Sequence, residues 1–221
     1  MTTEGSADRS AAFLRMLEEM HERNLVGVEG VREVWLVRHG DAYTGMEGLG
    51  EGVLDPPLTR LGREQSARLS RRLAEVPIDA IWASDLRRAV ETGRVVARPH
   101  GLNVRTDQRL REVRTYWDEG GAVGLNAPDE YPFPESEQDV YERVGAAIRD
   151  IVAGLPEKGR AVAVTHNAAI GIYVSNTLGL GWGKLPVMPM YTSVTILAIK
   201  DGRVVLRSLA DATHLLEASS G

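Results

Sequence analysis

Short, nearly continuous apolar runs along the chain predict the strands of a buried sheet. The first run lies in Glu33–Val37, and similar strands are predicted at Ala80–Ala83, Asn103–Thr106 and Ala161–Thr165. Runs without polar alternation are typical of strands that are covered on both faces, as in a parallel sheet.

Segments with helical periodicity separate these strands. Residues that favour helix ends bound them: Thr59 precedes the first helix, Pro99 follows the second, and Ser136 begins a sequence that resembles a capping box. The predicted helices extend from Thr59 to about Leu73, with Leu61, Leu69 and Leu73 as an apolar stripe, from Leu86 to about Arg98, from Ser136 to about Gly154, and from Asn167 to about Leu178. Alternating strands and helices favour an α/β domain with a mainly parallel sheet.

Two segments depart from this alternation. Ser193–Ile199 and Arg203–Leu209 are predicted to pair across the turn dipeptide Asp201-Gly202. The stretch from about Arg114 to Pro134 contains Gly, Pro and aromatic residues without a sustained period. Because long irregular segments in a compact domain are usually functional, we expect this stretch to cover the site.

An amphipathic helix is predicted ahead of the main fold, from about Asp8 to Arg23. Its apolar positions recur at helical spacing and are Phe13, Leu14, Met16, Leu17 and Met20. We expect this helix to cover an edge or face of the sheet, with contact to a separate partner as the alternative. The predicted organisation is an N-terminal extension at 1–30, one domain at 31–216 and a short tail at 217–221.

Composition narrows the classes of partner and compartment. The 221 residues include 31 acidic and 26 basic side chains, a formal net charge of −5, so no general surface for nucleic acid or an anionic membrane is expected. The absence of cysteine excludes disulfides, thiolate nucleophiles and cysteine-bound metals. The sequence also has no signal-peptide pattern and no apolar stretch long enough for a membrane helix, so we expect a soluble, cytoplasmic protein.

Polar clusters follow three of the predicted strands. They are Arg38-His39, Ser84–Arg88 and Thr165-His166. Ligands of open α/β sheets bind at the carboxyl ends of the strands, so these clusters should meet on one edge. Guanidinium groups suit a phosphoryl group, and an unprotonated imidazole beside them can attack phosphorus to form a phosphohistidine.

Several sequence blocks occur in the order and at the element boundaries of one known family. They are Arg38-His39-Gly40, Asp55–Thr59, Ser84–Ala89 and Val164-Thr165-His166. Together they resemble the histidine phosphatase superfamily, also called the phosphoglycerate-mutase-like superfamily, over about Val34 to His214. The resemblance implies a three-layer α/β/α fold with a mainly parallel sheet.

The resemblance also implies roles for individual residues. It makes His39 the nucleophile, Arg38 and Arg88 phosphate-binding groups, and His166 a second histidine that holds the phosphoryl group and supports catalysis. Glu112, in Leu110-Arg111-Glu112, matches the family's proton donor, which protonates the leaving group and then activates water. Asp118 and Glu119 follow it and stay open as alternatives for this role.

The chain departs from the family pattern at three places. Ala42 and Gly45 replace a Ser or Thr and an Asn that many members carry, so expected phosphate or substrate donors are missing. Asn167 stands where many members have Gly, and we expect it to cap its helix, with a side-chain hydrogen-bond donor for the site as the alternative. Pro134-Glu135-Ser136 is what is left of a longer block before the third helix of the domain, and capping is its expected role.

These observations favour a phosphomonoesterase that hydrolyses a small soluble phosphate ester through a phosphohistidine. The alternatives are a phosphoglycerate-type mutase and a catalytically silent phosphate-binding or scaffold protein. No cofactor is expected. A metal site built from His39, Asp41, Glu112 and His166 would lack a close-spaced ligand motif and would leave the arginines unexplained, so no metal is expected either. The substrate's identity and a homo-oligomeric state stay open.

Overall fold

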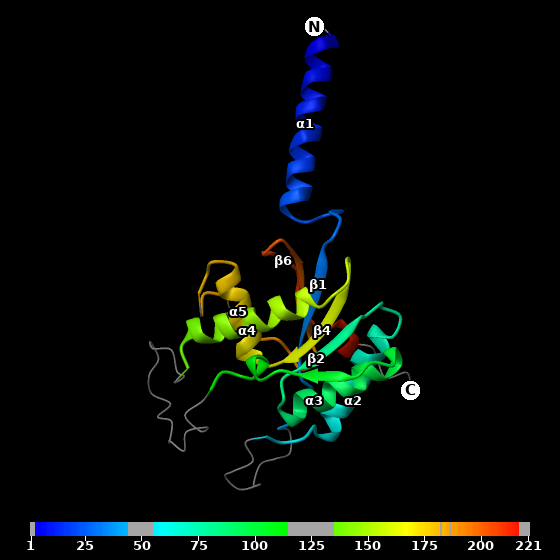
Figure 1. Ribbon diagram of the computed structural model, residues 1–221, viewed down its shortest axis with the longest axis vertical. Coiled ribbons are helices and arrows are strands. Elements are labelled where there is room, and N and C mark those ends of the chain that lie inside the picture. Colours follow the sequence, from blue (N-terminus) through cyan, green and yellow to red (C-terminus); the bar gives the residue numbers. More distant parts are fainter. Residues whose placement is uncertain (1–2, 44–54, 115–134, 182, 186, 217–221) are drawn as a thin grey trace.

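A six-stranded sheet forms the centre of the protein (Figure 1). The computed structural model describes residues 3–43, 55–114, 135–181, 183–185 and 187–216. The strand order is β3-β2-β4-β1-β5-β6, with β1 (Arg32–Arg38), β2 (Ala80–Ala83), β3 (Val104–Thr106), β4 (Arg160–Thr165), β5 (Val194–Lys200) and β6 (Arg203–Asp211). The first four of these strands are parallel to one another, whereas β5 is antiparallel to both β1 and β6.

Helices cover both faces of the sheet, which gives the expected three-layer fold (Figure 1). The helices α2 (Arg60–Leu73) and α3 (Arg87–Ala97) pack on one face, and α4 (Glu137–Ala153) and α5 (Asn167–Thr177) pack on the other. Short 3-10 turns lie at Arg98–His100, Gln108–Leu110 and Thr213–Leu215.

The strand residues alternate between two apolar cores. Leu36 and Ala163 belong to the core under α4 and α5, whereas their neighbours Val37, Val162 and Val164 belong to the core under α2 and α3. Both sets are fully buried, because each face of a central strand is covered by helices. Burial on both faces therefore explains why the strand sequences do not alternate between apolar and polar residues, as predicted.

The predicted helix boundaries are confirmed by side-chain caps. The side chain of Thr59 accepts a hydrogen bond from the amide of Gly62, and that of Ser136 accepts one from the amide of Asp139. The predicted stripe of α2 is wrong at its start, because Leu61 is 43% exposed. The buried face of α2 begins at Gly62, where a Cβ atom would lie 2.0 Å from the carbonyl oxygen of Asp41, so the helix and the loop after β1 are in direct backbone contact.

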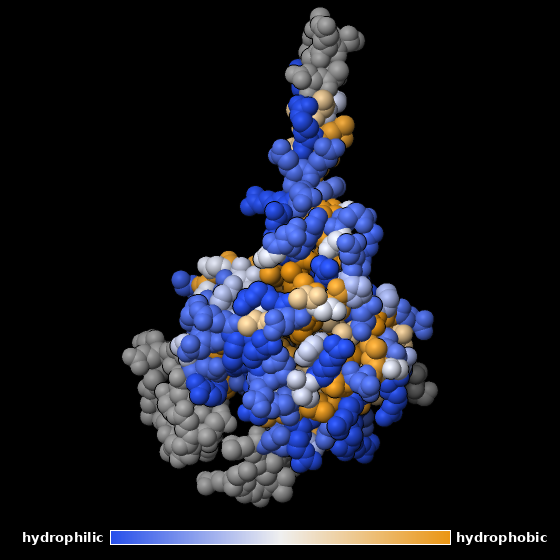
Figure 2. Space-filling model, in the orientation of Figure 1, coloured by the Kyte–Doolittle hydropathy of each residue, from blue (hydrophilic) through white to orange (hydrophobic). Residues whose placement is uncertain are grey.

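The N-terminal helix α1 (Thr3–Arg23) projects from the domain and does not cover the sheet (Figure 1). Its apolar side chains lie on the surface (Figure 2), and Phe13, Leu14, Met16 and Met20 are 47–58% exposed. The helix was predicted correctly, but its expected packing on the sheet is wrong. The edge strand β6 holds only the base of α1, where Arg203 Nη1 donates to the carbonyl oxygen of Glu22 at 3.0 Å.

A helix that crosses a membrane must be long and almost wholly apolar. None of the helices in the described part of the chain meets these requirements.

Candidate active site

Segments far apart in the sequence converge at the carboxyl edge of the parallel strands. The last residue of β1, Arg38, pairs with the last residue of β4, Thr165. The amide of His39 donates to the carbonyl oxygen of Thr165 at 3.0 Å, and that of Ser84, just after β2, donates to the carbonyl oxygen of Val164 at 2.8 Å. The three polar clusters predicted to meet on one edge are therefore brought together.

Two hydrogen bonds define the tautomer of His39. Nδ1 lies 2.7 Å from the carbonyl oxygen of Gly40, which can only accept, so Nδ1 carries the proton. The Nε of Arg88, which can only donate, lies 3.2 Å from Nε2 of His39, so Nε2 presents a lone pair. His39 is 3% exposed. Its buried ring therefore turns an unprotonated nitrogen toward a fixed cation.

Local backbone contacts hold His39 and Arg88 in this arrangement. The amide of Gly40 donates to Oγ1 of Thr92 at 3.0 Å, and the same hydroxyl donates to the carbonyl oxygen of Arg88 at 2.8 Å. One threonine on α3 thus links the residue after His39 to the first turn of the helix that carries Arg88.

The guanidinium groups of Arg38 and Arg88 each contact a protein oxygen and each keep one nitrogen that forms no hydrogen bond with the described residues. Arg38 Nη1 donates to the carbonyl oxygen of Pro189 at 2.7 Å, and Arg88 Nη1 lies 3.7 Å from Oδ1 of Asp55. Among the described residues, Nε of Arg38 and Nη1 of Arg88 are buried without a hydrogen-bond partner. Buried donors of this kind favour an anionic ligand that would complete their hydrogen bonds.

His166 lies beside His39 and is fully buried. The two ring centroids are 5.1 Å apart at an interplanar angle of 61°. Neither ring nitrogen of His166 has a hydrogen-bond partner within the described part of the chain. Burial, with the nearby His39 and Arg88 as further causes, holds the pKa of His166 well below its ordinary value. The ring is therefore neutral near pH 7, with one N–H available as a donor.

Glu112 reaches this pocket from the segment after β3 and caps the start of α5. Its carboxylate accepts hydrogen bonds from the amides of Ala169 at 3.0 Å and Ala168 at 3.3 Å, and from that of Val113 at 3.0 Å. Burial raises the pKa of Glu112, although these amides and the charge of Arg88 act in the opposite direction. A carboxyl group with a raised pKa suits proton transfer near neutral pH.

This contact corrects the expected role of Asn167. The residue before the helix is His166, which makes no side-chain cap, and Asn167 is already the first helical residue. Its Oδ1 atom is buried with no hydrogen-bond partner in the regions that the structure describes. Since the carboxylate of Glu112 binds the free amides at this end, the prediction that Asn167 caps α5 is wrong.

Other predicted residues lie outside this arrangement. Asp118 and Glu119, the alternative proton donors, and Gly45 fall outside the described residues. Ala42 is fully buried and carries no polar side-chain atom. Among the described residues, no group of three or more His, Cys, Asp or Glu side chains could hold a metal ion.

Two tyrosines flank the pocket and were not predicted. The ring of Tyr191 lies 5.8 Å from that of His39, and the guanidinium carbon of Arg38 lies 4.0 Å above it. The ring of Tyr43 also lies near His39, with the two ring centroids 6.4 Å apart. Tyr191 precedes β5, and an antiparallel β5 begins at the edge where β1 ends. The direction of β5 was therefore the signal that could have identified Tyr191.

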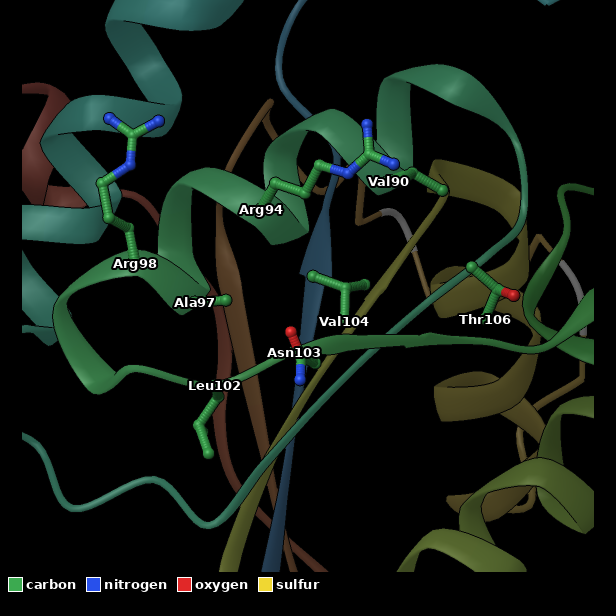
Figure 3. A pocket seen from close by; sticks show the side chains of 8 residues that line it. All are labelled: Val90, Arg94, Ala97, Arg98, Leu102, Asn103, Val104 and Thr106. Carbon is green, nitrogen blue, oxygen red and sulfur yellow. The ribbon is translucent and has the colours of Figure 1, made fainter.

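A hollow of about 330 Å³ lies away from this pocket, between α3 and β3 (Figure 3). Its lining comes from one side of α3 and from the segment that forms β3, and consists of Val90, Arg94, Ala97, Arg98, Leu102, Asn103, Val104 and Thr106. These side chains include neither an imidazole nor a carboxylate, so the lining of this hollow offers no general base or acid of those two kinds.

The buried, neutral state of His39 predicts a pH-dependent stability. Burial, together with the charge of Arg88, lowers the pKa of His39 from 6.5 to about 3. Between these values the unfolded chain binds a proton that the folded chain does not, so stability rises with pH in this window and is lost as the pH falls through it. For His39 alone, linkage gives a loss of about 2 kcal/mol in the free energy of unfolding from pH 7 to pH 5.

Urea unfolding of the wild-type protein and of His39→Asn at both pH values measures this effect. His166 is present in both proteins, and burial, which is the main cause of its low pKa, does not depend on His39, so most of its contribution cancels in the comparison. The variant is expected to lose about 2 kcal/mol less than the wild type on acidification, because asparagine does not titrate. An equal loss in the two proteins would show that His39 is not held neutral by its surroundings.

The fold and the pocket together define an α/β protein with two neutral imidazoles and two guanidinium groups at the carboxyl edge of its sheet. Residues 34–212 match the histidine phosphatase superfamily (branch 1), so the chain belongs to this superfamily. The resemblance inferred from the sequence blocks is confirmed.

The proteins that this chain resembles include some named as mutases and some named as phosphatases. "Probable phosphoglycerate mutase GpmB" from Enterobacter sp. (strain 638) is 35% identical over 163 residues, which cover 67% of this chain and 75% of that protein. The structure of a mycobacterial glucosyl-3-phosphoglycerate phosphatase is 26% identical, with a TM-score of 0.66 over 80% of this chain and 96% of that one. Phosphoglycerate mutase from Bacillus anthracis str. Sterne is 21% identical, with a TM-score of 0.69 over 88% of this chain and 98% of its own, which shows the shared fold.

Proposed function

We propose that the protein is a phosphomonoesterase that hydrolyses a small phosphate ester through a phosphohistidine on Nε2 of His39. The observation that carries this proposal is the tautomer of His39, because a buried neutral ring with a lone pair directed at Arg88 is ready to attack an anion bound there. The free donors of Arg38 and Arg88 and the ring of His166 would bind the phosphoryl oxygens.

The first displacement transfers the phosphoryl group to the enzyme. Nε2 of His39 forms a bond to phosphorus while the bond from phosphorus to the ester oxygen breaks. The departing oxygen takes a proton from the protonated carboxyl group of Glu112 and leaves as an alcohol. Before this step, the phosphoryl oxygens must take over the N–H of Arg88 that now binds Nε2.

The second displacement returns the enzyme to its starting state. A water molecule gives a proton to the Glu112 carboxylate and attacks phosphorus. The bond from phosphorus to Nε2 breaks, its electron pair returns to the ring of His39, and inorganic phosphate leaves. Glu112 is then protonated for the next turnover, so the same carboxyl group serves as acid and as base.

A phosphoglycerate-type mutase is the second candidate, since the 35% identical relative carries that name. Such an enzyme returns the phosphoryl group to a bound substrate and must exclude water. The described pocket supports hydrolysis more than transfer, because the fully buried Ala42 supplies no hydroxyl donor where mutases of the superfamily usually carry Ser.

Product analysis separates the two activities. With 3-phosphoglycerate and a panel of sugar phosphates, nucleotides and phosphoamino acids, the purified protein is expected to release inorganic phosphate faster than it forms any isomer. In water enriched in ¹⁸O, each phosphate should carry one atom from solvent. Faster isomerisation of phosphoglycerate than phosphate release would reverse the assignment in favour of a mutase.

A further inference from the structure

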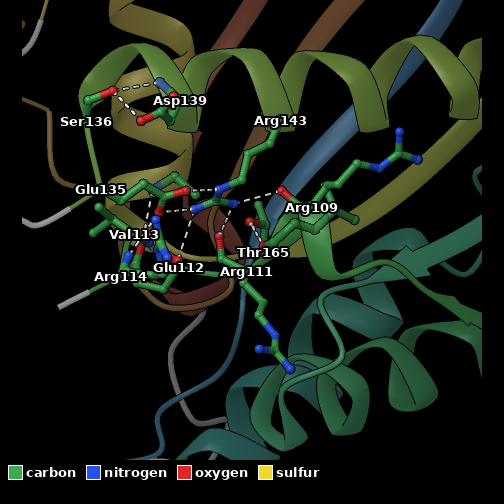
Figure 4. A network of polar contacts seen from close by, with 12 residues as sticks. Arg109, Arg111, Glu112, Val113, Arg114, Glu135, Ser136, Asp139, Arg143 and Thr165 are labelled. Carbon is green, nitrogen blue, oxygen red and sulfur yellow. Dashed lines mark hydrogen bonds and ion pairs between the residues drawn. The ribbon is translucent and has the colours of Figure 1, made fainter. Parts of the chain in front are cut away.

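The segment that carries Glu112 is irregular, yet its backbone is fixed at nearly every residue. Thr165, at the end of β4, donates through Oγ1 to the carbonyl oxygen of Leu110 at 2.7 Å. Arg143, on α4, donates through Nη1 to the carbonyl oxygens of Arg109 at 2.8 Å and Arg111 at 2.7 Å. The same side chain donates through Nη2 to the carbonyl oxygen of Glu112 at 3.0 Å (Figure 4).

The buried carboxylate of Glu135 accepts hydrogen bonds from the remaining N–H groups of Arg143. Arg143 Nε lies 2.6 Å from Oε1 of Glu135, and Nη2 lies 2.9 Å from Oε2 (Figure 4). Oε2 of Glu135 also accepts from the amide of Arg114 at 3.0 Å. All five N–H groups of Arg143 are therefore used, and the pair binds backbone atoms on both sides of Glu112.

Arg143 and Glu135 balance one another's charge at a position with little exposure to solvent. Glu135 is 6% exposed, and the side chain of Arg143 is 19% exposed. Burial alone would raise the pKa of Glu135, but the hydrogen bonds from Arg143 and from the amide of Arg114 hold it below its ordinary value. Both partners are ionised, so the guanidinium group keeps a fixed plane and fixed donor directions.

Stability alone does not explain such a pair. Removing two charges from water costs free energy, and apolar side chains of similar size often stabilise a core as well or better. What apolar packing cannot supply is a set of directed donors that fixes several carbonyl groups at once. Because these carbonyl groups are fixed, the Glu112 carboxylate is held where it accepts hydrogen bonds from the amides of Ala168 and Ala169, next to His166.

We propose that Arg143 and Glu135 form a positioning pair that holds Glu112 at proton-transfer distance from the leaving oxygen. Neither residue touches the reacting atoms in this proposal; both act through the backbone of the segment that carries Glu112. The inference rests on the proposed function, in which Glu112 is the acid and base.

Arg143→Lys tests the proposal, because lysine keeps the charge but not the planar fork. An alkyl phosphate needs a proton at its leaving oxygen, whereas 2,4-dinitrophenyl phosphate does not. The substitution is expected to lower kcat on the alkyl phosphate by about 10- to 100-fold, as small misplacements of reacting groups do, with KM nearly unchanged. Phosphoenzyme formation from 2,4-dinitrophenyl phosphate should change less than about 3-fold. Arg149→Lys, at an exposed position of the same helix, is the matched control.

The Glu112→Gln background separates positioning from a general structural role. There Arg143→Lys should cause no further loss on the alkyl phosphate, since the group that it positions is absent. Equal losses on both esters, or an additive loss in the double variant, would overturn the proposal. Glu135→Gln is the second variant if Arg143→Lys unfolds; it should show the same selective loss for the alkyl ester, and an unselective loss would again overturn it.

The two proposals can fail separately. A loss in Glu112→Gln without one in Arg143→Lys or Glu135→Gln would reject the positioning pair and leave the proposed function intact. No selective loss in Glu112→Gln would reject the acid role of Glu112 and the positioning pair with it.

Discussion

Glu112→Gln is expected to lower kcat on an alkyl phosphate by about 10²- to 10⁴-fold, the usual contribution of a positioned general acid. Glutamine has nearly the same size, and its one amide oxygen can keep the 3.0 Å hydrogen bond from Ala169, so the start of α5 should lose only the longer bond from Ala168. It cannot give a proton to an alkoxide. Values of kcat/KM, which report the formation of the phosphoenzyme and not its later hydrolysis, test this effect on esters whose alcohols span a wide range of acidity.

The loss should shrink as the leaving alcohol becomes more acidic, since such an alcohol departs without a proton. Glu142→Gln, at an exposed position on α4, is the matched control and should leave all rates unchanged. A uniform loss across the series would mean that Glu112 maintains the pocket and does not transfer the proton. Wild-type rates throughout would direct attention to other carboxylates.

His39→Ala is expected to lower kcat/KM on every phosphate monoester by about 10⁴-fold or more, because removal of a nucleophile eliminates the covalent route. Phosphate binding should persist, since Arg38, Arg88 and His166 are unchanged. Turnover of a chromogenic ester in chelator, with equilibrium binding of inorganic phosphate, measures both properties. His21→Ala, on the exposed face of α1, is the control for a histidine outside the pocket.

Retention of more than about a tenth of the wild-type activity by His39→Ala would contradict the covalent mechanism. Loss of phosphate binding together with activity would instead indicate that the imidazole is needed to form the pocket. The two outcomes are distinct because the guanidinium groups do not depend on His39 for all of their contacts.

The strands could be predicted from the sequence because a short, nearly continuous apolar run indicates a strand that is buried on both faces. Ala80–Ala83 was predicted with its bounds, and the other strands differ from the prediction by one or two residues. The position of α1 could not be predicted in the same way. Periodicity identifies an apolar stripe on a helix but does not say what covers it, and in α1 the stripe is exposed.

The residues of the pocket that lie at the carboxyl ends of parallel strands could be predicted from the sequence. Arg38 ends β1, and His39 and His166 directly follow β1 and β4, so one rule places them on a common edge. The cap that Glu112 forms on α5 joins residues 56 and 57 positions apart. Arg143 reaches its carbonyl partners over 31 to 34 positions, and no local sequence pattern indicates contacts at such separations.

The most direct test of the covalent mechanism is to locate the phosphoryl group on the enzyme. Glu112→Gln protein mixed with 2,4-dinitrophenyl phosphate should become phosphorylated and dephosphorylate slowly, because the leaving group needs no acid and the attacking water has lost its base. After an alkaline quench, ³¹P NMR and mass spectrometry of the digested protein should place one acid-labile phosphoryl group on Nε2 of His39. Hydrolysis by the wild-type protein without any phosphorylated histidine, or with the label on another residue, would contradict the proposed mechanism.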